Sequence, residues 1–189
     1  EEAWRLVEAN SASLLRARMG AEVVALERFR AELGRIGAVA LQYSVATPDR
    51  VVASVVTPDT VTVRVLPLPP DFVREVSTAM QLLSGGSPED LCRPVLARIS
   101  DALLAGLDLR GDRLIVIPGA FAGLPFEALL YGDVELGDRV AISYAPSATA
   151  FVGLQERAVA GTGMLALADP SIDETRAAGD LEGLGAMRR

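Results

Sequence analysis

The stretch 114–129, LIVIPGAFAGLPFEAL, decides how the rest of the chain is interpreted. It begins with four branched apolar residues, stops at Pro118-Gly119, and resumes at Pro125 with Phe-Glu-Ala-Leu. A continuous apolar run of this length is typical of a strand that is covered on both faces of a parallel sheet. We therefore expect a buried strand over 114–117, an exit loop over 118–123 and a helix that begins near Pro125. Three side chains of that helix are expected to point inward: Phe126, Leu129 and Leu130.

Similar runs follow this stretch, and helices precede it. RVAISYAP and GMLALADP also predict strands, and Pro146-Ser147 opens a helix between them. Upstream, Asp71 is the expected cap of one helix, and Ser87 that of a second with Pro88 at its first helical position. Strands that alternate with helices predict an α/β layer with a largely parallel sheet.

Residues 39–68 are rich in β-branched side chains, and two TPD stretches interrupt them at 47–49 and 57–59. The spacing predicts a three-stranded antiparallel meander with prolines at the turns. In its third strand the valines 61, 63 and 65 alternate with polar residues, which predicts one buried and one wet face.

The first part of the chain reads as one long amphipathic helix, from Glu2 to about Ile36, that Gly37 ends. It is either packed on the rest of the protein or the last helix of a helical-repeat array. The expected organisation is therefore a long helix over 1–38, a β meander over 39–68 and an α/β part over 69–189.

Composition excludes several functions. The chain has 189 residues, 50% hydrophobic, and all 18 basic residues are arginines set against 25 acidic ones, for a net charge of −7. Scattered arginines on an acidic chain do not predict nucleic-acid binding. No apolar run is long enough to span a membrane, so we expect a cytoplasmic protein without a membrane partner. The chain has no histidine, and its single cysteine, Cys92, permits neither an internal disulfide nor a cysteine-built metal site.

Individual residues that suggest chemistry each have a structural alternative. Gly119 and Gly123 lie in a strand-to-helix loop, but the loop matches neither the P-loop nor the dinucleotide pattern, so no cofactor is expected. Ser147 lacks the GxSxG context of a nucleophile, which favours a helix cap. Cys92, on a mostly apolar helix, is expected to be a small buried hydrophobe. Glu127 fits the first turn of a helix, where a carboxylate is favourable.

The order of these blocks resembles the leading half of a CHAT domain, a caspase-like cysteine peptidase domain of clan CD that is often joined to TPR repeats in bacterial proteins. The resemblance covers nearly the whole chain, and LPFEAL with YAPS downstream is its most specific part. The positions that carry the family signature are Pro118, Leu124, Pro125, Phe126, Glu127, Tyr144, Pro146, Ser147 and Pro170.

The resemblance implies an α/β fold, a partial caspase-like three-layer sandwich, and a hydrolase whose histidine and cysteine lie beyond residue 189. No catalytic residue is therefore assigned within this chain, and no metal. Asp169 and Asp173, after the last expected strand, are the candidate substrate-binding residues. The end at Arg188-Arg189 fits a processing site, a truncation or an arbitrary boundary equally well.

Two functions follow as expectations. The chain is the non-catalytic half of a CHAT-type peptidase, or a peptidase-dead scaffold of the same fold that binds a protein partner. In either case an incomplete parallel sheet predicts a partner along its edge, either the remainder of the domain or a second chain. A protein substrate or regulator would then bind the completed domain.

Overall fold

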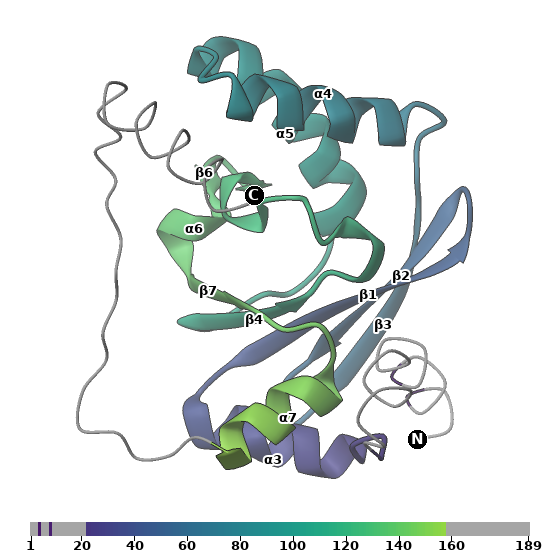
Figure 1. Ribbon diagram of the computed structural model, residues 1–189, viewed down its shortest axis with the longest axis vertical. Coiled ribbons are helices and arrows are strands. Elements are labelled where there is room, and N and C mark those ends of the chain that lie inside the picture. Colours follow the sequence, from purple (N-terminus) through teal and green to yellow (C-terminus); the bar gives the residue numbers. More distant parts are fainter. Residues whose placement is uncertain (1–3, 5–7, 9–21, 158–189) are drawn as a thin grey trace, which may run out of the picture. The chain divides into compact units, whose positions relative to one another are not determined.

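The computed structural model describes Trp4, Glu8 and residues 22–157 (Figure 1). These belong to the first of two compact units, Glu1–Arg157 and Ala158–Arg189. The strands are β1 (Val39–Thr47), β2 (Arg50–Val56), β3 (Val61–Pro67), β4 (Arg113–Ile117), β5 (Leu130–Tyr131), β6 (Val134–Glu135) and β7 (Ala141–Tyr144). The α-helices are α3 (Leu26–Ile36), α4 (Phe72–Ser84), α5 (Glu89–Leu104), α6 (Leu136–Arg139) and α7 (Ala148–Arg157). Two short 3-10 helices are η1 (Gly119–Phe121) and η2 (Phe126–Ala128).

A five-stranded mixed sheet organises the unit, in the order β3-β2-β1-β4-β7. Strands β1, β2 and β3 form the predicted antiparallel meander, whereas β1, β4 and β7 run parallel to one another. Both TPD stretches form the turns between meander strands, which confirms that prediction. The mixed α/β class predicted from the alternating blocks is likewise confirmed.

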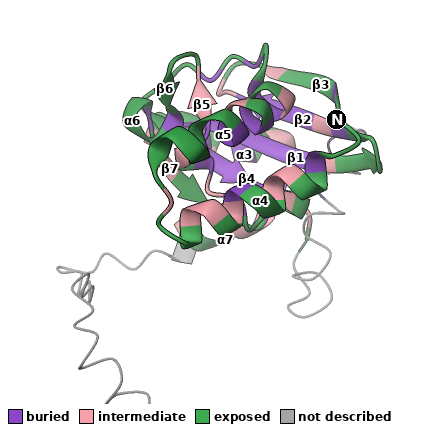
Figure 2. Ribbon diagram, turned by 90° about the horizontal axis from the view of Figure 1, so that it is seen from above, coloured by how far each residue is buried: buried purple, intermediate pink, exposed green. Residues whose placement is uncertain are grey.

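Helices cover both faces of this sheet (Figure 1). Helices α4 and α5 pack on one face, over a core that includes Leu41, Tyr43 and Val116. Helices α3 and α7 pack on the other face, where Phe29, Leu33 and the β4 residues Ile115 and Ile117 are buried. Because alternate residues of β4 point to opposite faces, both clusters depend on its apolar run. Figure 2 shows the buried residues concentrated in the sheet and on the inward side of α5.

The third strand of the meander is less buried than its alternation predicted. Val63 and Val65 are each 57% exposed, and only Leu66 of β3 is buried. The prediction of a buried valine face is therefore wrong for most of the strand. The reason is position, because β3 is an edge strand and Val61 alone of the three valines packs, in part, against the core under α3 and α7.

The long helix predicted to run to Ile36 is also wrong, because residues 22–25 are not helical and α3 begins at Leu26. Polar partners hold this segment extended instead. Trp4 Nε1 donates a hydrogen bond to the Val24 carbonyl at 3.2 Å, and the Val24 N–H donates to Thr149 Oγ1 at 3.1 Å. Because the Val24 N–H donates to Thr149, it is not free to bond a carbonyl one helical turn earlier. The helix ends at Gly37 (φ 66°), as predicted.

Two details of the helix starts differ from prediction. Pro88, not Ser87, is the N-cap of α5, because its extended backbone (ψ 148°) places the first helical residue at Glu89. Asp71 precedes α4 as predicted, but its carboxylate pairs with Arg74 at 2.8 Å and caps no backbone N–H.

The helix predicted at Pro125 is a single 3-10 turn, η2, that ends at Ala128, and Leu129 after it is extended (ψ 147°). The turn does not continue as a helix, because backbone groups of the next two residues form hydrogen bonds with other elements. Leu136 N donates to the Leu129 carbonyl at 2.7 Å, and Leu130 N donates to Ser100 Oγ at 2.7 Å. Phe126 and Leu129 are buried as predicted, whereas Leu130 is half-buried.

Strand β7 borders the sheet within the described residues, since it pairs with β4 alone. The expected strand over 164–167 lies outside the described residues, as do Asp169, Pro170 and Asp173. None of the helices in the described part of the chain is both long and apolar enough to cross a bilayer.

Candidate functional site

The candidate site lies where the parallel strands β4 and β7 end beside each other. Val116 pairs with Tyr144, and the Ala145 N–H donates to the Val116 carbonyl at 2.9 Å. The loops that follow the two strands therefore emerge at the same edge. Ligands of α/β proteins bind beyond the carboxyl ends of parallel strands, which makes this edge the natural place for a site.

The two signature blocks meet here through the hydroxyl of Tyr144. That hydroxyl accepts a hydrogen bond from the Phe126 N–H at 2.8 Å and donates one to Glu127 Oε2. The YAPS block thus holds the start of the LPFEAL turn through both its backbone and its carboxylate. Sequence reasoning named these residues as a signature but did not predict this contact, because they lie 17 and 18 positions apart.

Burial, and then the hydrogen bond to Glu127, raise the pKa of Tyr144 to about 12. A phenol with a raised pKa stabilises the fold in its neutral form. Its contribution is complete below the ordinary value near pH 10 and is lost as the pH rises toward 12. The tyrosine is 46% exposed, so this link lies at the surface of the site.

An aromatic cluster supports the link from below. Phe126 is fully buried, with its ring centroid 5.6 Å from that of Tyr43 and 6.4 Å from that of Tyr144. Tyr43 also meets Phe121, of the exit loop, edge to face at 5.5 Å. Its hydroxyl donates to the Leu103 carbonyl at 2.8 Å, and burial raises the pKa of this phenol well above its ordinary value. The site therefore rests on α5 and β1.

Glycine is required at the start of the exit loop. Gly119 has φ 57°, and a Cβ there would lie 2.6 Å from the Tyr43 carbonyl oxygen. Such a contact is far below van der Waals distance, so the backbone of the loop lies directly against β1. Packing accounts for this glycine without a phosphate ligand. Gly137 is similar, since a Cβ there would lie 2.9 Å from Glu127 Cβ.

Ser147 is the N-cap of α7, which confirms the prediction. Its Oγ accepts the Ala150 N–H at 3.0 Å, and the side chain is fully buried. Of the other signature residues that the structure describes, Leu124 and Pro118 are buried and Pro146 is exposed. Half of the eight signature residues that the structure describes are therefore buried: Pro118, Leu124, Phe126 and Ser147.

Sequence reasoning missed Glu8. Its carboxylate is fully buried and accepts hydrogen bonds from the Thr149 N–H at 2.7 Å, the Ala148 N–H at 3.3 Å and Gln42 Nε2 at 3.1 Å. An anion is favourable at a helix start, where free N–H groups and the helix dipole meet it. Since 140 residues separate Glu8 from Ala148, no local pattern could have revealed the contact.

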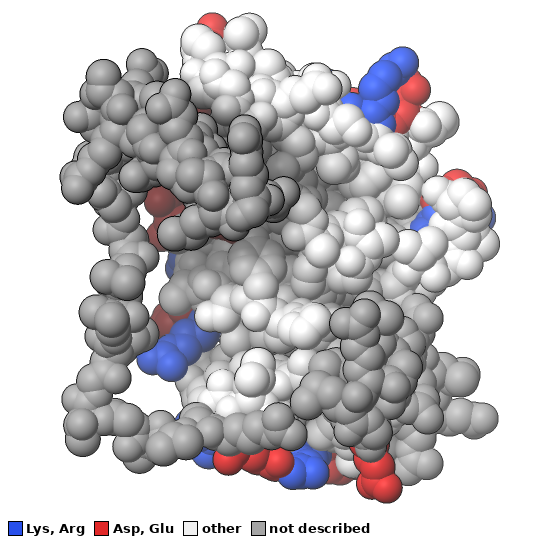
Figure 3. Space-filling model, viewed as in Figure 1, with Lys and Arg blue, Asp and Glu red and all other residues white. Residues whose placement is uncertain are grey.

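Other candidate chemistry lies away from this edge. Cys92 is 6% exposed, and its thiol donates to the Ser87 carbonyl at 3.6 Å, which confirms a buried hydrophobe. Among the described residues no group of three or more Cys, Asp or Glu side chains could hold a metal. On the face drawn in Figure 3, the charged side chains are scattered, acidic beside basic, without a basic stripe.

A scan against protein-family models finds no matching family, and a search of curated proteins finds no matching relative. The chemistry of the edge must therefore be inferred from its geometry. A rigid, aromatic-backed loop pair with one exposed carboxylate can position a backbone or a partner's side chain.

Proposed function

We propose that this chain is the scaffold half of a CHAT-type, caspase-like cysteine endopeptidase, with the histidine and cysteine supplied by sequence beyond residue 189. One observation carries the proposal. The two most specific signature blocks, separate in the sequence, are joined by the Tyr144 hydroxyl at the carboxyl edge of β4 and β7. A peptidase that takes its catalytic residues from the next strands would need this edge held rigid.

The arrangement of layers supports the same proposal. Parallel strands β1, β4 and β7 have helices on both faces, and β7 is paired on one side within the described residues. In the proposed three-layer caspase-like sandwich, further strands continue the sheet from β7 and bring the catalytic pair to the edge that Tyr144 holds. Asp169 and Asp173 would then line the substrate cleft of this cytoplasmic enzyme.

The direct test is activity of the natural reading frame that includes the sequence after Arg189. We expect cleavage of a fluorogenic peptide library that is abolished when the downstream cysteine is replaced by alanine. Tyr144→Phe, in a protein that still carries the downstream cysteine, should reduce kcat/KM. A folded long protein with no endopeptidase activity toward any peptide, or one whose activity survives loss of the cysteine, contradicts the proposal.

The alternative is a peptidase-dead scaffold, and the exposed valines of the edge strand β3 favour it. Val63 and Val65 present apolar surface on a strand that, within the described residues, pairs with β2 alone, a feature that recruits protein partners. Both functions require further polypeptide along the sheet, either the remainder of the domain or a second chain. Light scattering of the 189-residue chain should therefore show self-association or instability, and a stable, monodisperse monomer would contradict the partner in either case.

A further inference from the structure

Strand β3 (Val61–Pro67) borders the five-stranded sheet on the side opposite to β7, and within the described residues it pairs with β2 alone. Figure 2 shows the strand at the rim of the sheet, largely exposed. A strand in this position presents one row of backbone N–H and C=O groups to any further strand. Which residues supply that row follows from the way β3 pairs with β2.

The hydrogen bonds just outside the two ends of the β2–β3 pair fix its pattern. The Thr57 N–H donates to the Thr60 carbonyl at 2.9 Å, and the Leu68 N–H donates to the Asp49 carbonyl at 2.8 Å. Both pairs continue the register of β2 with β3. Because bonded and non-bonded pairs alternate along antiparallel strands, Thr60 and every second residue after it bond towards β2.

The outward row therefore belongs to the three valines of β3. The N–H and C=O groups of Val61, Val63 and Val65 all point away from β2. Pro67 comes next in the same row and has no N–H, so the donors stop at Val65. The row of three residues is symmetric about Val63.

We propose that β3 pairs antiparallel with β3 of a second copy of this chain, about a two-fold axis beside Val63. In this register Val63 faces its counterpart and Val61 faces Val65, so every outward N–H and C=O of the three valines gains a partner. Each copy uses the same strand, so the contact closes at a dimer. This inference does not rest on the proposed peptidase function, whose further strands join the opposite edge of the sheet, at β7.

The charge on the strand favours a second copy in this register. Arg64 is the one charged residue of β3, and about the Val63 axis it falls opposite Thr62 of the second copy. An axis beside Arg64 would instead place two guanidinium groups opposite each other, which is destabilising. Although the chain carries a net charge of −7, the strand itself contains no acid, so the pairing brings no carboxylates of β3 together.

The side chains of the strand leave its edge accessible. Val63 and Val65 are each 57% exposed, and valines that face each other across the axis cover this apolar surface. The Arg64 side chain is turned onto the loop after α5, since a Cβ at Gly106 would lie 3.5 Å from Arg64 Nη1. The register with β2 contains no shift, so β3 has no bulge that would bend the edge away from a partner.

The first test is sedimentation equilibrium of the 189-residue chain over about a hundredfold range of concentration. We expect a monomer–dimer equilibrium that Val63→Glu weakens by at least about tenfold, because two carboxylates would lie opposite each other at the axis. Val45→Glu is the matched control, because Val45 is 53% exposed and lies on β1, inside the sheet. It should leave the equilibrium unchanged. Both positions are exposed, so both variants should fold, which circular dichroism checks.

Disulfide trapping tests the register. Facing residues of a hydrogen-bonded antiparallel pair have Cα atoms about 5.5 Å apart, within reach of a disulfide, so Val63→Cys should link two copies on mild oxidation. Val65→Cys, equally exposed on the same strand, should not, because its two copies stand about 14 Å apart along the strands. The natural Cys92 is buried and does not compete.

A monomer at every concentration overturns the proposal, and so does a dimer that Val63→Glu leaves intact. Linkage through Val65→Cys but not through Val63→Cys also overturns it, because the register is then different. Protection of the Val63 and Val65 amides from hydrogen exchange in a monomer would show that another part of the same chain covers the strand, with the same consequence. None of these results depends on whether the longer protein cleaves peptides.

Discussion

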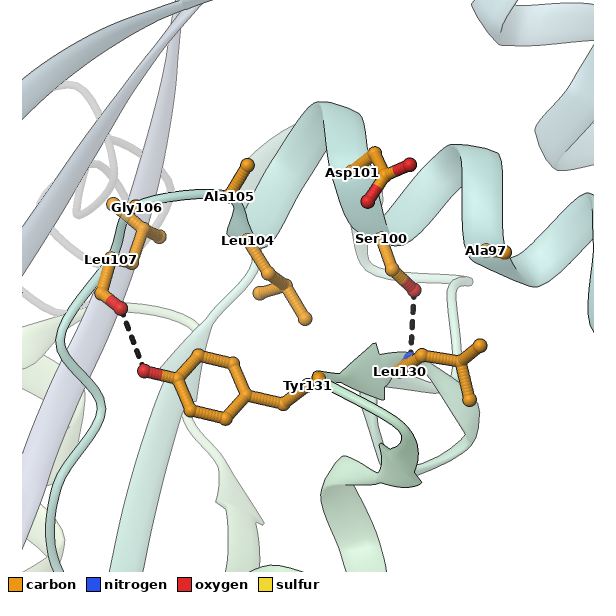
Figure 4. Close-up of a pocket in the computed structure, with 10 residues that line it drawn as sticks. Ala97, Ser100, Asp101, Leu104, Ala105, Gly106, Leu107, Leu130 and Tyr131 are labelled. Atoms are coloured by element: carbon orange, nitrogen blue, oxygen red, sulfur yellow. Dashed lines mark hydrogen bonds between the residues drawn. The ribbon is translucent and has the colours of Figure 1, made fainter.

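Two regions of the molecule use a tyrosine and a carboxylate in opposite ways. At the edge formed by β4 and β7, the Tyr144 hydroxyl bonds Glu127 and the Phe126 backbone, and Glu8 bonds the start of α7. In the pocket between the carboxyl-terminal half of α5 and the β5–β6 hairpin (Figure 4), the Tyr131 hydroxyl bonds backbone groups. The exposed Asp101 carboxylate makes no hydrogen bond or ion pair within the described residues. The first region satisfies its carboxylates with hydrogen bonds from the protein. The second leaves its exposed carboxylate to water.

Truncating the aromatic support of the edge should have the largest effect. Phe126→Ala is expected to lower the free energy of unfolding by about 3–5 kcal/mol, because it opens a cavity beneath Tyr144 in a fully buried cluster. Leu104→Ala in the pocket should cost nearer about 2 kcal/mol, since the space joins a pocket that water can fill. Urea unfolding of both variants measures the difference. Equal losses would mean that the two regions are packed alike.

The next largest difference between the two regions should come from replacing a loop glycine by alanine in each. Gly119 and Gly106 both have positive φ, 57° and 70°, but only at Gly119 would a Cβ meet backbone, at 2.6 Å. We expect Gly119→Ala to cost roughly 2–3 kcal/mol and Gly106→Ala roughly 1 kcal/mol. Thermal unfolding checks the order. A milder effect at Gly119 than at Gly106 would show that its loop does not lie against β1.

Removing the carboxylate at each of two helix ends should change the free energy of unfolding in opposite directions. Glu8→Ala removes an acceptor from Ala148 and Thr149 and should lower stability by roughly 1.5–3 kcal/mol. Hydrogen exchange of those two amides should accelerate together. Asp101→Asn should instead raise stability by about 0.3 kcal/mol. If Glu8→Ala leaves both amides protected, the carboxylate does not hold α7.

The strands of the five-stranded sheet, the meander turns and the Ser147 cap could be predicted because each depends on local composition and spacing. The apolar run of β4 and the turn residues after it contain that information within a few positions. Position in the sheet is not local, so the alternation in β3 predicted a strand correctly and its burial wrongly. Likewise, the turn at Phe126 could not be told from a helix start, because Ser100 and Leu136 end it from other elements.

The site was predictable only as a set of residue types. The resemblance named Phe126, Glu127 and Tyr144. The hydrogen bonds from the Tyr144 hydroxyl to the other two residues depend on the register of β4 and β7, which no single stretch of sequence encodes. Glu8 and Asp101 gave no signal at all. One is an acid on a predicted helix whose partners lie more than 100 positions away, and the other is an exposed acid in the last turn of α5.

The central claim, that the Tyr144 hydroxyl joins the two signature blocks into one rigid edge, is tested most directly by a double-mutant cycle. Tyr144→Phe, Glu127→Ala and the double variant are unfolded in urea at pH 8, below the range in which this phenol, with its pKa raised to about 12, ionises. We predict a coupling free energy of about 1 kcal/mol, because each single change removes the same hydrogen bond. Losses that add to within about 0.3 kcal/mol would contradict the claim.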